Sequence, residues 1–113
     1  MKLKISLSKA EGIALLTAVP ECSRFYHWAS GIYISRMPDN TVYKIILHAH
    51  DGQSVKRYTL TPESMMRGAN LAIQPECKLE PELKEAIQSG KFTPDIVLDT
   101  IIQIALFGEV AHQ

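Results

Sequence analysis

Residues 41–60, TVYKIILHAHDGQSVKRYTL, decide the fold. The stretch 41–50 is rich in valine, tyrosine and isoleucine, which suit a pleated sheet, and 54–60 has a similar content. Asp51-Gly52 separates the two stretches, and glycine readily takes the positive φ that a tight hairpin turn needs. The sequence therefore predicts two antiparallel strands joined by a hairpin.

A further strand is predicted upstream of this hairpin, between Ser23 and the turn Pro38-Asp39-Asn40. Its aromatic and β-branched residues are Phe25, Tyr26, Trp28, Ile32, Tyr33 and Ile34. The three strands form an antiparallel meander. In the middle strand, alternation places Tyr43, Ile45, Leu47 and Ala49 on the core side, and Val42, Lys44, Ile46, His48 and His50 on the other.

Before the meander, the N-terminal residues predict one strand and one helix. Leu3, Ile5 and Leu7 alternate with polar residues, as in a half-buried strand. Ser8 and Glu11 have the spacing of a capping box, and Pro20 ends the helix that follows.

Three helices are predicted after the meander. They begin at Thr61-Pro62-Glu63, at Glu80-Pro81 and at Thr93-Pro94-Asp95, and they end near Pro75, Gly90 and Gly108. Gly68 weakens the first of them by about 1 kcal/mol relative to alanine, and close packing is one reason to keep it. We expect residues 1–113 to form a single α+β domain.

The last helix is apolar on more than one face. Its apolar residues are Ile96, Val97, Leu98, Ile101, Ile102, Ile104, Ala105, Leu106 and Phe107. A helix of this kind is either central to the core or partly covered by another chain. Both alternatives remain open here, and Ile102 and Leu106 are the candidate residues of a homodimer.

Composition narrows the class of protein. Apolar residues make up 46 %, and twelve basic residues balance twelve acidic ones, which argues against a dedicated nucleic-acid binder. No apolar run approaches the roughly 20 residues that cross a bilayer, and we expect no signal peptide. Cys22 and Cys77 are expected as free thiols. The sequence predicts a cytoplasmic protein without a membrane partner.

Two segments carry a resemblance. Residues 57–63, RYTLTPE, and 94–110, PDIVLDTIIQIALFGEV, resemble a family of small bacteriophage and prophage proteins with Y-T-L-T-P-E and Q-x-x-x-F-G-E-[IV]-V segments. The family's aromatic pair, usually Tyr-Trp, corresponds to Tyr26 and Trp28, which His27 separates here. The spacer from Cys77 to Gly90 departs from the acidic, aromatic-rich spacer of other members. The resemblance implies a virus-encoded accessory protein in the host cytoplasm, and it carries over no catalytic residues.

His48 and His50 are candidate metal ligands. On a strand they point to the same face and could share Zn²⁺, with Asp51, His27 or Cys22 completing the site. Strong zinc signatures have two ligand pairs, however, and this sequence has one H-x-H. An exposed strand end is the favoured interpretation.

Enzymatic chemistry has little support. Cys22 with His27 or His48 supplies the residue types of a nucleophile and its base, but no family signature surrounds the cysteine. Nucleophile-elbow, phosphate-loop and paired-carboxylate motifs do not occur. We therefore expect a protein that is not an enzyme, with no cofactor and no catalytic residues.

The preferred function is binding to a host protein, for example to inhibit a defence system such as CRISPR. Tyrosine, tryptophan, methionine and arginine are enriched in protein interfaces. We expect the contact residues to be the exposed members of Tyr26, Trp28, Tyr33, Lys56 and Arg57. The same mixture occurs on sheets that bind single-stranded nucleic acid, which is the alternative.

Overall fold

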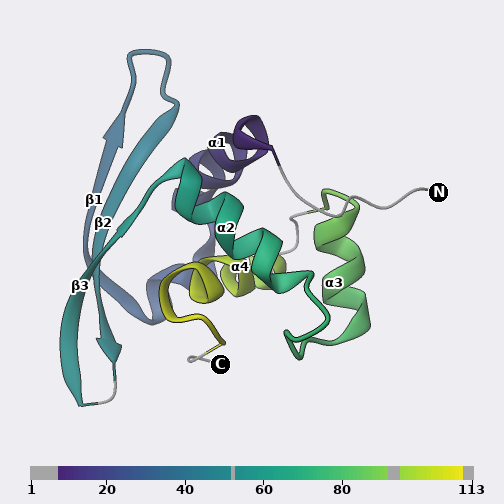
Figure 1. Ribbon diagram of the computed structural model, residues 1–113. Coiled ribbons are helices and arrows are strands. Elements are labelled where there is room, and N and C mark those ends of the chain that lie inside the picture. The colour runs from purple at the N-terminus through teal and green to yellow at the C-terminus, as the bar shows by residue number, and fades with distance from the viewer. Residues whose placement is uncertain (1–7, 52, 92–94, 111–113) are drawn as a thin grey trace.

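The computed structural model describes residues 8–51, 53–91 and 95–110. It has an α+β fold in which a three-stranded antiparallel sheet carries its helices on one side (Figure 1). In chain order the elements are α1 (Lys9–Ala18), the 3₁₀ turns η1 (Val19–Glu21) and η2 (Ser23–His27), β1 (Ala29–Arg36), β2 (Val42–Asp51), β3 (Ser54–Leu60), α2 (Pro62–Ala72), α3 (Pro81–Gln88) and α4 (Asp95–Phe107). The strand predicted at Leu3, Ile5 and Leu7 lies outside the described residues.

The predicted meander is confirmed. The strands lie in the order β1-β2-β3, and Asp51 pairs with Ser54 at the end of the β2–β3 hairpin. Ile45, Leu47 and Ala49 of β2 are buried against the helices, as the alternation predicted. The sheet therefore turns one face to the core and leaves the other without a helix over it (Figure 1).

The start of β1 was predicted too early. Ser23–His27 is a 3₁₀ turn, and the strand begins only at Ala29. Phe25 is buried there, and its ring meets the Trp28 ring edge-on with centroids 5.4 Å apart. Aromatic residues fit a packed turn as well as a strand, so tertiary packing overrides their β propensity.

Val42 lies on the buried side of β2 and Tyr43 on the exposed side, which is the reverse of the prediction. The cause is an irregular strand pairing at the start of β2. Ser35 pairs with Lys44 and Arg36 with Val42, so β2 holds one extra residue at Tyr43. A bulge of this kind shifts the alternation by one position. As a result Val42 is buried and Tyr43 is exposed.

α1 begins with the predicted capping box. The Ser8 hydroxyl accepts a hydrogen bond from the Glu11 backbone N–H, and the Glu11 carboxylate accepts one from the Ser8 backbone N–H. The helix ends at Ala18, and Pro20 lies in the following 3₁₀ turn.

Two glycines let the helices approach each other closely. A Cβ on Gly12 of α1 would collide with the Pro62 carbonyl oxygen at the start of α2. A Cβ on Gly68 of α2 would lie 2.7 Å from the Ala105 Cβ of α4. Close packing is therefore the reason for the glycine inside α2.

α4 is a core helix, and this corrects one of the two self-association residues. Ile102 is 0 % exposed within a single chain, so it cannot contact a second copy while the chain stays folded. Leu106 is partly buried and packs against the same core. None of the helices in the described ranges combines the length and apolar character needed to cross a membrane.

Candidate functional site

One side of the sheet has none of the described helices over it (Figure 1). Strand register and alternation assign ten side chains to this outer sheet face. They are Ser30, Tyr33 and Ser35 of β1, Lys44, Ile46, His48 and His50 of β2, and Val55, Arg57 and Thr59 of β3.

The outer sheet face combines apolar and cationic groups. Tyr33 is 74 % exposed and Val55 57 % exposed, with the partly exposed Ile46 opposite Tyr33. Lys44 and Arg57 supply positive charge, and the ten side chains include no carboxylate. The face is therefore electrostatically complementary to an acidic surface.

A bulge in β1 shapes this face. Ser30 pairs with His48 and Tyr33 pairs with Ile46, so β1 holds one extra residue between these pairs. Gly31 lies at this point with φ +58°, and a Cβ there would lie 2.6 Å from His48 Nδ1. The glycine thus lets the backbone of β1 approach the imidazole, and the bulge returns Tyr33 to the outer side.

The structure brings together two of the five predicted contact residues. Tyr33 and Arg57 lie on the outer sheet face, with Ile46 and His48 of β2 as their respective cross-strand neighbours. Lys56 is exposed but pairs with Ala49, so it belongs to the opposite side of β3. That part of the β2–β3 hairpin projects past the helices (Figure 1).

The other two predicted contact residues hold the fold together. The Trp28 indole Nε1–H donates to Asp99 Oδ1 at 2.7 Å, and its ring packs edge-on against Phe107. The Tyr26 hydroxyl donates to the Pro20 carbonyl oxygen at 2.9 Å, although its ring is 45 % exposed. Tyr26 lies in η2 and Trp28 follows it, so both precede the first residue of β1.

The histidines lie as predicted. His48 and His50 share the outer sheet face, and His50 is exposed while His48 is partly covered. Among the side chains that the structure describes, which do not include that of Asp51, no three of the His, Cys, Asp or Glu type gather closely enough to hold a metal ion.

Cys22 lies in the hydrophobic core, where it has a structural role. It is buried, and its Sγ–H donates to the Asp95 carbonyl oxygen at 3.6 Å. Burial, together with the nearby Asp95 and Asp99 carboxylates, raises the pKa of the thiol. His27, its suggested base, is exposed. The environment of Cys22 thus favours the protonated thiol over the nucleophilic thiolate.

Sequence reasoning missed a buried carboxylate. Asp99 of α4 is 4 % exposed and accepts hydrogen bonds from the Trp28 indole and, at 2.8 Å, from the Gln103 side-chain amide. Arg24 Nε lies 3.8 Å from Asp99 Oδ2. An aspartate on an otherwise apolar helix was the available signal, since a buried acid needs such partners.

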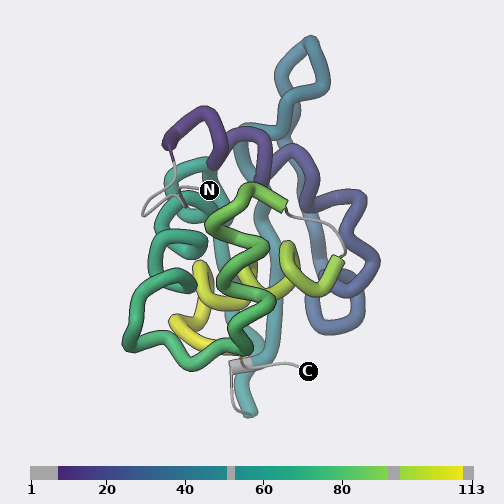
Figure 2. Tube along the Cα trace, turned by 90° about the vertical axis from the view of Figure 1, so that its right-hand side faces the viewer, coloured from purple at the N-terminus to yellow at the C-terminus, as the bar shows by residue number. Residues whose placement is uncertain are grey.

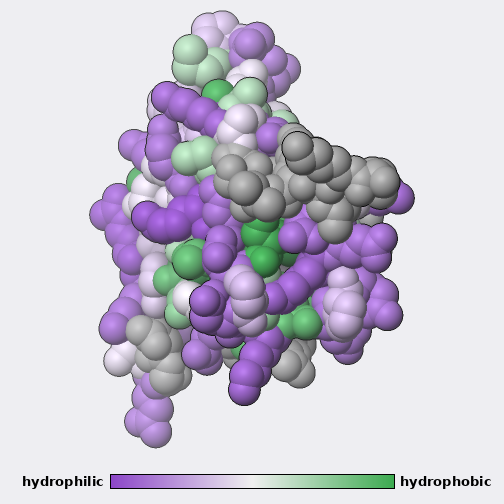
Figure 3. Space-filling view, turned by 45° about the vertical axis from the view of Figure 1, so that its right-hand side comes forward, coloured by the Kyte–Doolittle hydropathy of each residue, from purple (hydrophilic) through white to green (hydrophobic). Residues whose placement is uncertain are grey.

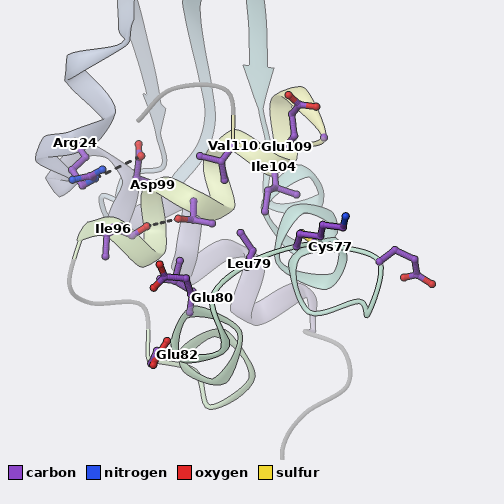
Figure 4. A pocket seen from close by; sticks show the side chains of 15 residues that line it. Arg24, Cys77, Leu79, Glu80, Glu82, Ile96, Asp99, Ile104, Glu109 and Val110 are labelled. Carbon is purple, nitrogen blue, oxygen red and sulfur yellow. Dashed lines mark hydrogen bonds and ion pairs between the residues drawn. The ribbon is translucent and has the colours of Figure 1, made fainter.

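Asp99 also lines a groove that the sequence did not reveal. The groove has a volume of about 890 Å³ and lies between α4 and the segment that leads into α3 (Figure 4). Its apolar wall is formed by Leu79, Leu83, Ile96, Ile104 and Val110. On the side of the molecule that carries α3, hydrophobic side chains otherwise show as small separate patches in a largely hydrophilic surface (Figure 3).

Comparison with known proteins gives no match: no family model, no curated protein and no solved structure is significantly similar to this chain.

Proposed function

We propose that this protein acts by binding another protein through its outer sheet face and performs no chemistry of its own. The observation that carries the proposal is the uncovered sheet with exposed Tyr33 and Val55 beside Lys44 and Arg57. Aromatic and arginine side chains contribute most of the binding energy in many interfaces. The absence of carboxylates among the ten residues favours an acidic partner.

The biological setting follows from the resemblance to small phage proteins. A virus-encoded accessory protein of this size would act on a protein of the host bacterium, and a component of a defence system such as CRISPR is a suitable target. Inhibition of that kind needs only an occupied surface.

The test compares two double variants that remove the same kinds of side chain. Tyr33→Ala/Arg57→Ala alters the outer sheet face, and Leu71→Ala/Arg67→Ala removes an exposed apolar residue and an arginine from α2. Tagged full-length proteins are used to capture partners from bacterial lysate treated with nuclease. We expect a stoichiometric protein that the wild type and the α2 variant retain and the sheet variant loses. Equal capture by all three proteins would rule out the outer sheet face as the binding surface.

Nucleic acid is the second candidate, because Tyr33, Lys44 and Arg57 place an aromatic ring and two cations on one open sheet. In that case the captured material disappears with nuclease. Binding to a single-stranded oligonucleotide would then fall steeply between about 50 and 200 mM salt.

A further inference from the structure

We infer that the groove between α4 and the start of α3 is a second binding site, and that it takes a peptide segment in which basic residues alternate with apolar ones. The groove uses none of the side chains of the outer sheet face. The inference therefore stands or falls separately from the function proposed above.

The apolar side chains that line the groove favour the binding of an apolar group. Leu79 lies between the two sides of the groove, with Ile104 and Val110 on the α4 side (Figure 4). At the other end Ile96, on the first turn of α4, is 41 % exposed. Covering such side chains is favourable because it removes apolar surface from water.

The charges around this wall determine the chemistry of the occupant. Five acidic residues line the groove, Glu76, Glu80, Glu82, Asp99 and Glu109, against two basic ones, Arg24 and Lys78. Arg24 is already directed toward Asp99, at 3.8 Å. The remaining balance is negative, so a cationic ligand is favoured over an anionic one.

The carboxylates stand on both sides of the apolar centre. Glu109 lies beyond the end of α4, whereas Glu80 and Glu82 lie at the start of α3, with Leu79 and Ile104 between them (Figure 4). A segment with an apolar side chain between two basic ones matches this order. At about 890 Å³ the groove also has room for several side chains, at the upper end of the range for small-ligand pockets.

The supporting walls differ in how firmly they are held. α4 is buried along most of its length, whereas α3 buries only Ile87 and stands on the side of the molecule away from the sheet (Figure 2). An incoming segment would therefore pack against a fixed wall on one side.

The probe is a fluorescein-labelled acetyl-Lys-Leu-Lys-Leu-Lys-Leu amide, titrated with the full-length protein and read by fluorescence polarisation. We expect saturable binding that Glu80→Gln/Glu82→Gln weakens by about fivefold to tenfold, since two ion pairs at exposed positions are lost. The control Glu21→Gln/Glu63→Gln removes the same charge from exposed positions outside the groove and should leave the affinity unchanged.

Two further measurements separate this site from general charge attraction. Ile96→Ser should weaken binding by about fivefold through lost apolar contact, and a peptide with serine in place of leucine should bind at least as poorly. Amide shifts in the ¹⁵N spectrum should change at the groove and not on the outer sheet face.

Several outcomes would overturn the inference. These are absence of saturation at millimolar protein, equal weakening by the Glu21/Glu63 control, equal binding of the serine peptide, or shifts confined to the sheet. Groove shifts that appear on concentrating the protein alone would make a second copy of the chain the occupant.

Discussion

Gly68 shows how a single missing side chain sets the distance between two helices. Alanine at this position of α2 would improve helix propensity by about 1 kcal/mol. Its Cβ, however, would lie 2.7 Å from the Ala105 Cβ and 2.8 Å from the Ile101 carbonyl oxygen of α4. We expect Gly68→Ala to lower the free energy of unfolding by about 1–3 kcal/mol, measured by urea denaturation.

The comparison variant for this prediction is Ala14→Gly on the exposed side of α1. It should lose about 1 kcal/mol through helix propensity alone. A Gly68→Ala protein as stable as the wild type, or more stable, would show that α2 and α4 can separate at no cost.

The Asp99 carboxylate holds side chains from η2, the residue after it and α4 together. Asp99→Ala removes the carboxylate that accepts from the Trp28 indole and the Gln103 amide and that faces Arg24, so we expect a loss of about 3 kcal/mol. Asp99→Asn should lose about 1 kcal/mol, because its amide oxygen still accepts from Trp28 while Gln103 can turn its own amide over. Trp28 is the sole tryptophan, and its fluorescence reports unfolding in urea. Equal stability of the Ala and Asn variants would contradict this account.

At the scale of elements, a hydrogen-bonded contact joins the start of α4 to η2. The Ser23 hydroxyl and backbone N–H donate to Asp95 Oδ2 at 2.6 and 2.9 Å. These bonds, with the nearby Arg24 guanidinium, lower the pKa of the Asp95 carboxyl. In an unfolded chain the pKa of an aspartate is about 3.9. The contact therefore stabilises the fold above about pH 4 and loses its effect as the pH falls through the lower folded pKa.

Ser23→Ala tests this contact. Without the hydroxyl donor, the folded pKa of Asp95 should rise toward its ordinary value. The loss of stability below about pH 4 should then be smaller than in the wild type. Urea midpoints between pH 2 and 7 give the stability, and the ¹³C shift of the Asp95 carboxyl gives the pKa. An unchanged Asp95 titration would mean that Ser23 is not its main donor.

Local signals predicted most of the elements. The capping box at Ser8, the Thr61-Pro62 helix start and the 41–60 hairpin depend on neighbouring residues, and the structure has all three. The wrong predictions concern residues whose position depends on contacts with residues far away in the sequence. Phe25 is drawn into the core from a turn, and the bulge at Tyr43 is set by strand pairing rather than by residue type.

For the candidate sites, too, the sequence predicted the features that neighbouring residues determine and missed those that distant contacts determine. Strand alternation placed His48 and His50 on one face, but it could not tell that Trp28 turns toward a carboxylate in α4. The groove joins residues near 24, 80 and 104, and no local spacing marks such a meeting.

Residues 57–63 and 94–110, the two segments singled out in the sequence, contact each other in the structure. Tyr58 of the first segment packs edge-on against Phe107 of the second, with ring centroids 5.2 Å apart. Gln103 donates to Asp99, and Gly108 takes a φ of +78° just after α4. The two segments thus form one packed unit.

For the whole molecule, the burial of Ile102 has a direct consequence. Ile102→Glu would place a charge in the apolar core at a cost comparable with the total stability of a small domain. We expect an unfolded chain by circular dichroism, whereas Ile96→Glu, at an exposed position on the same helix, should stay folded. A folded Ile102→Glu monomer obtained from a dimeric wild type would restore Ile102 as an interface residue.

Charge is unevenly distributed although the chain as a whole is neutral. The outer sheet face carries cations without carboxylates, whereas the groove on the α3 side carries five carboxylates against two cations. The two surfaces differ in the sign of their charge, so a charged partner would be attracted to one of them over the other. Zero net charge, taken alone, hides this polarity.

The alternation along the strands also gives neighbouring residues different structural roles. Leu47 and Ala49 serve the core, while their neighbours Ile46 and His48 face outward. Substitutions at the outward positions should therefore have little effect on folding. Under the proposed function, they would alter the affinity for a partner while the core side of the same strands stays unchanged.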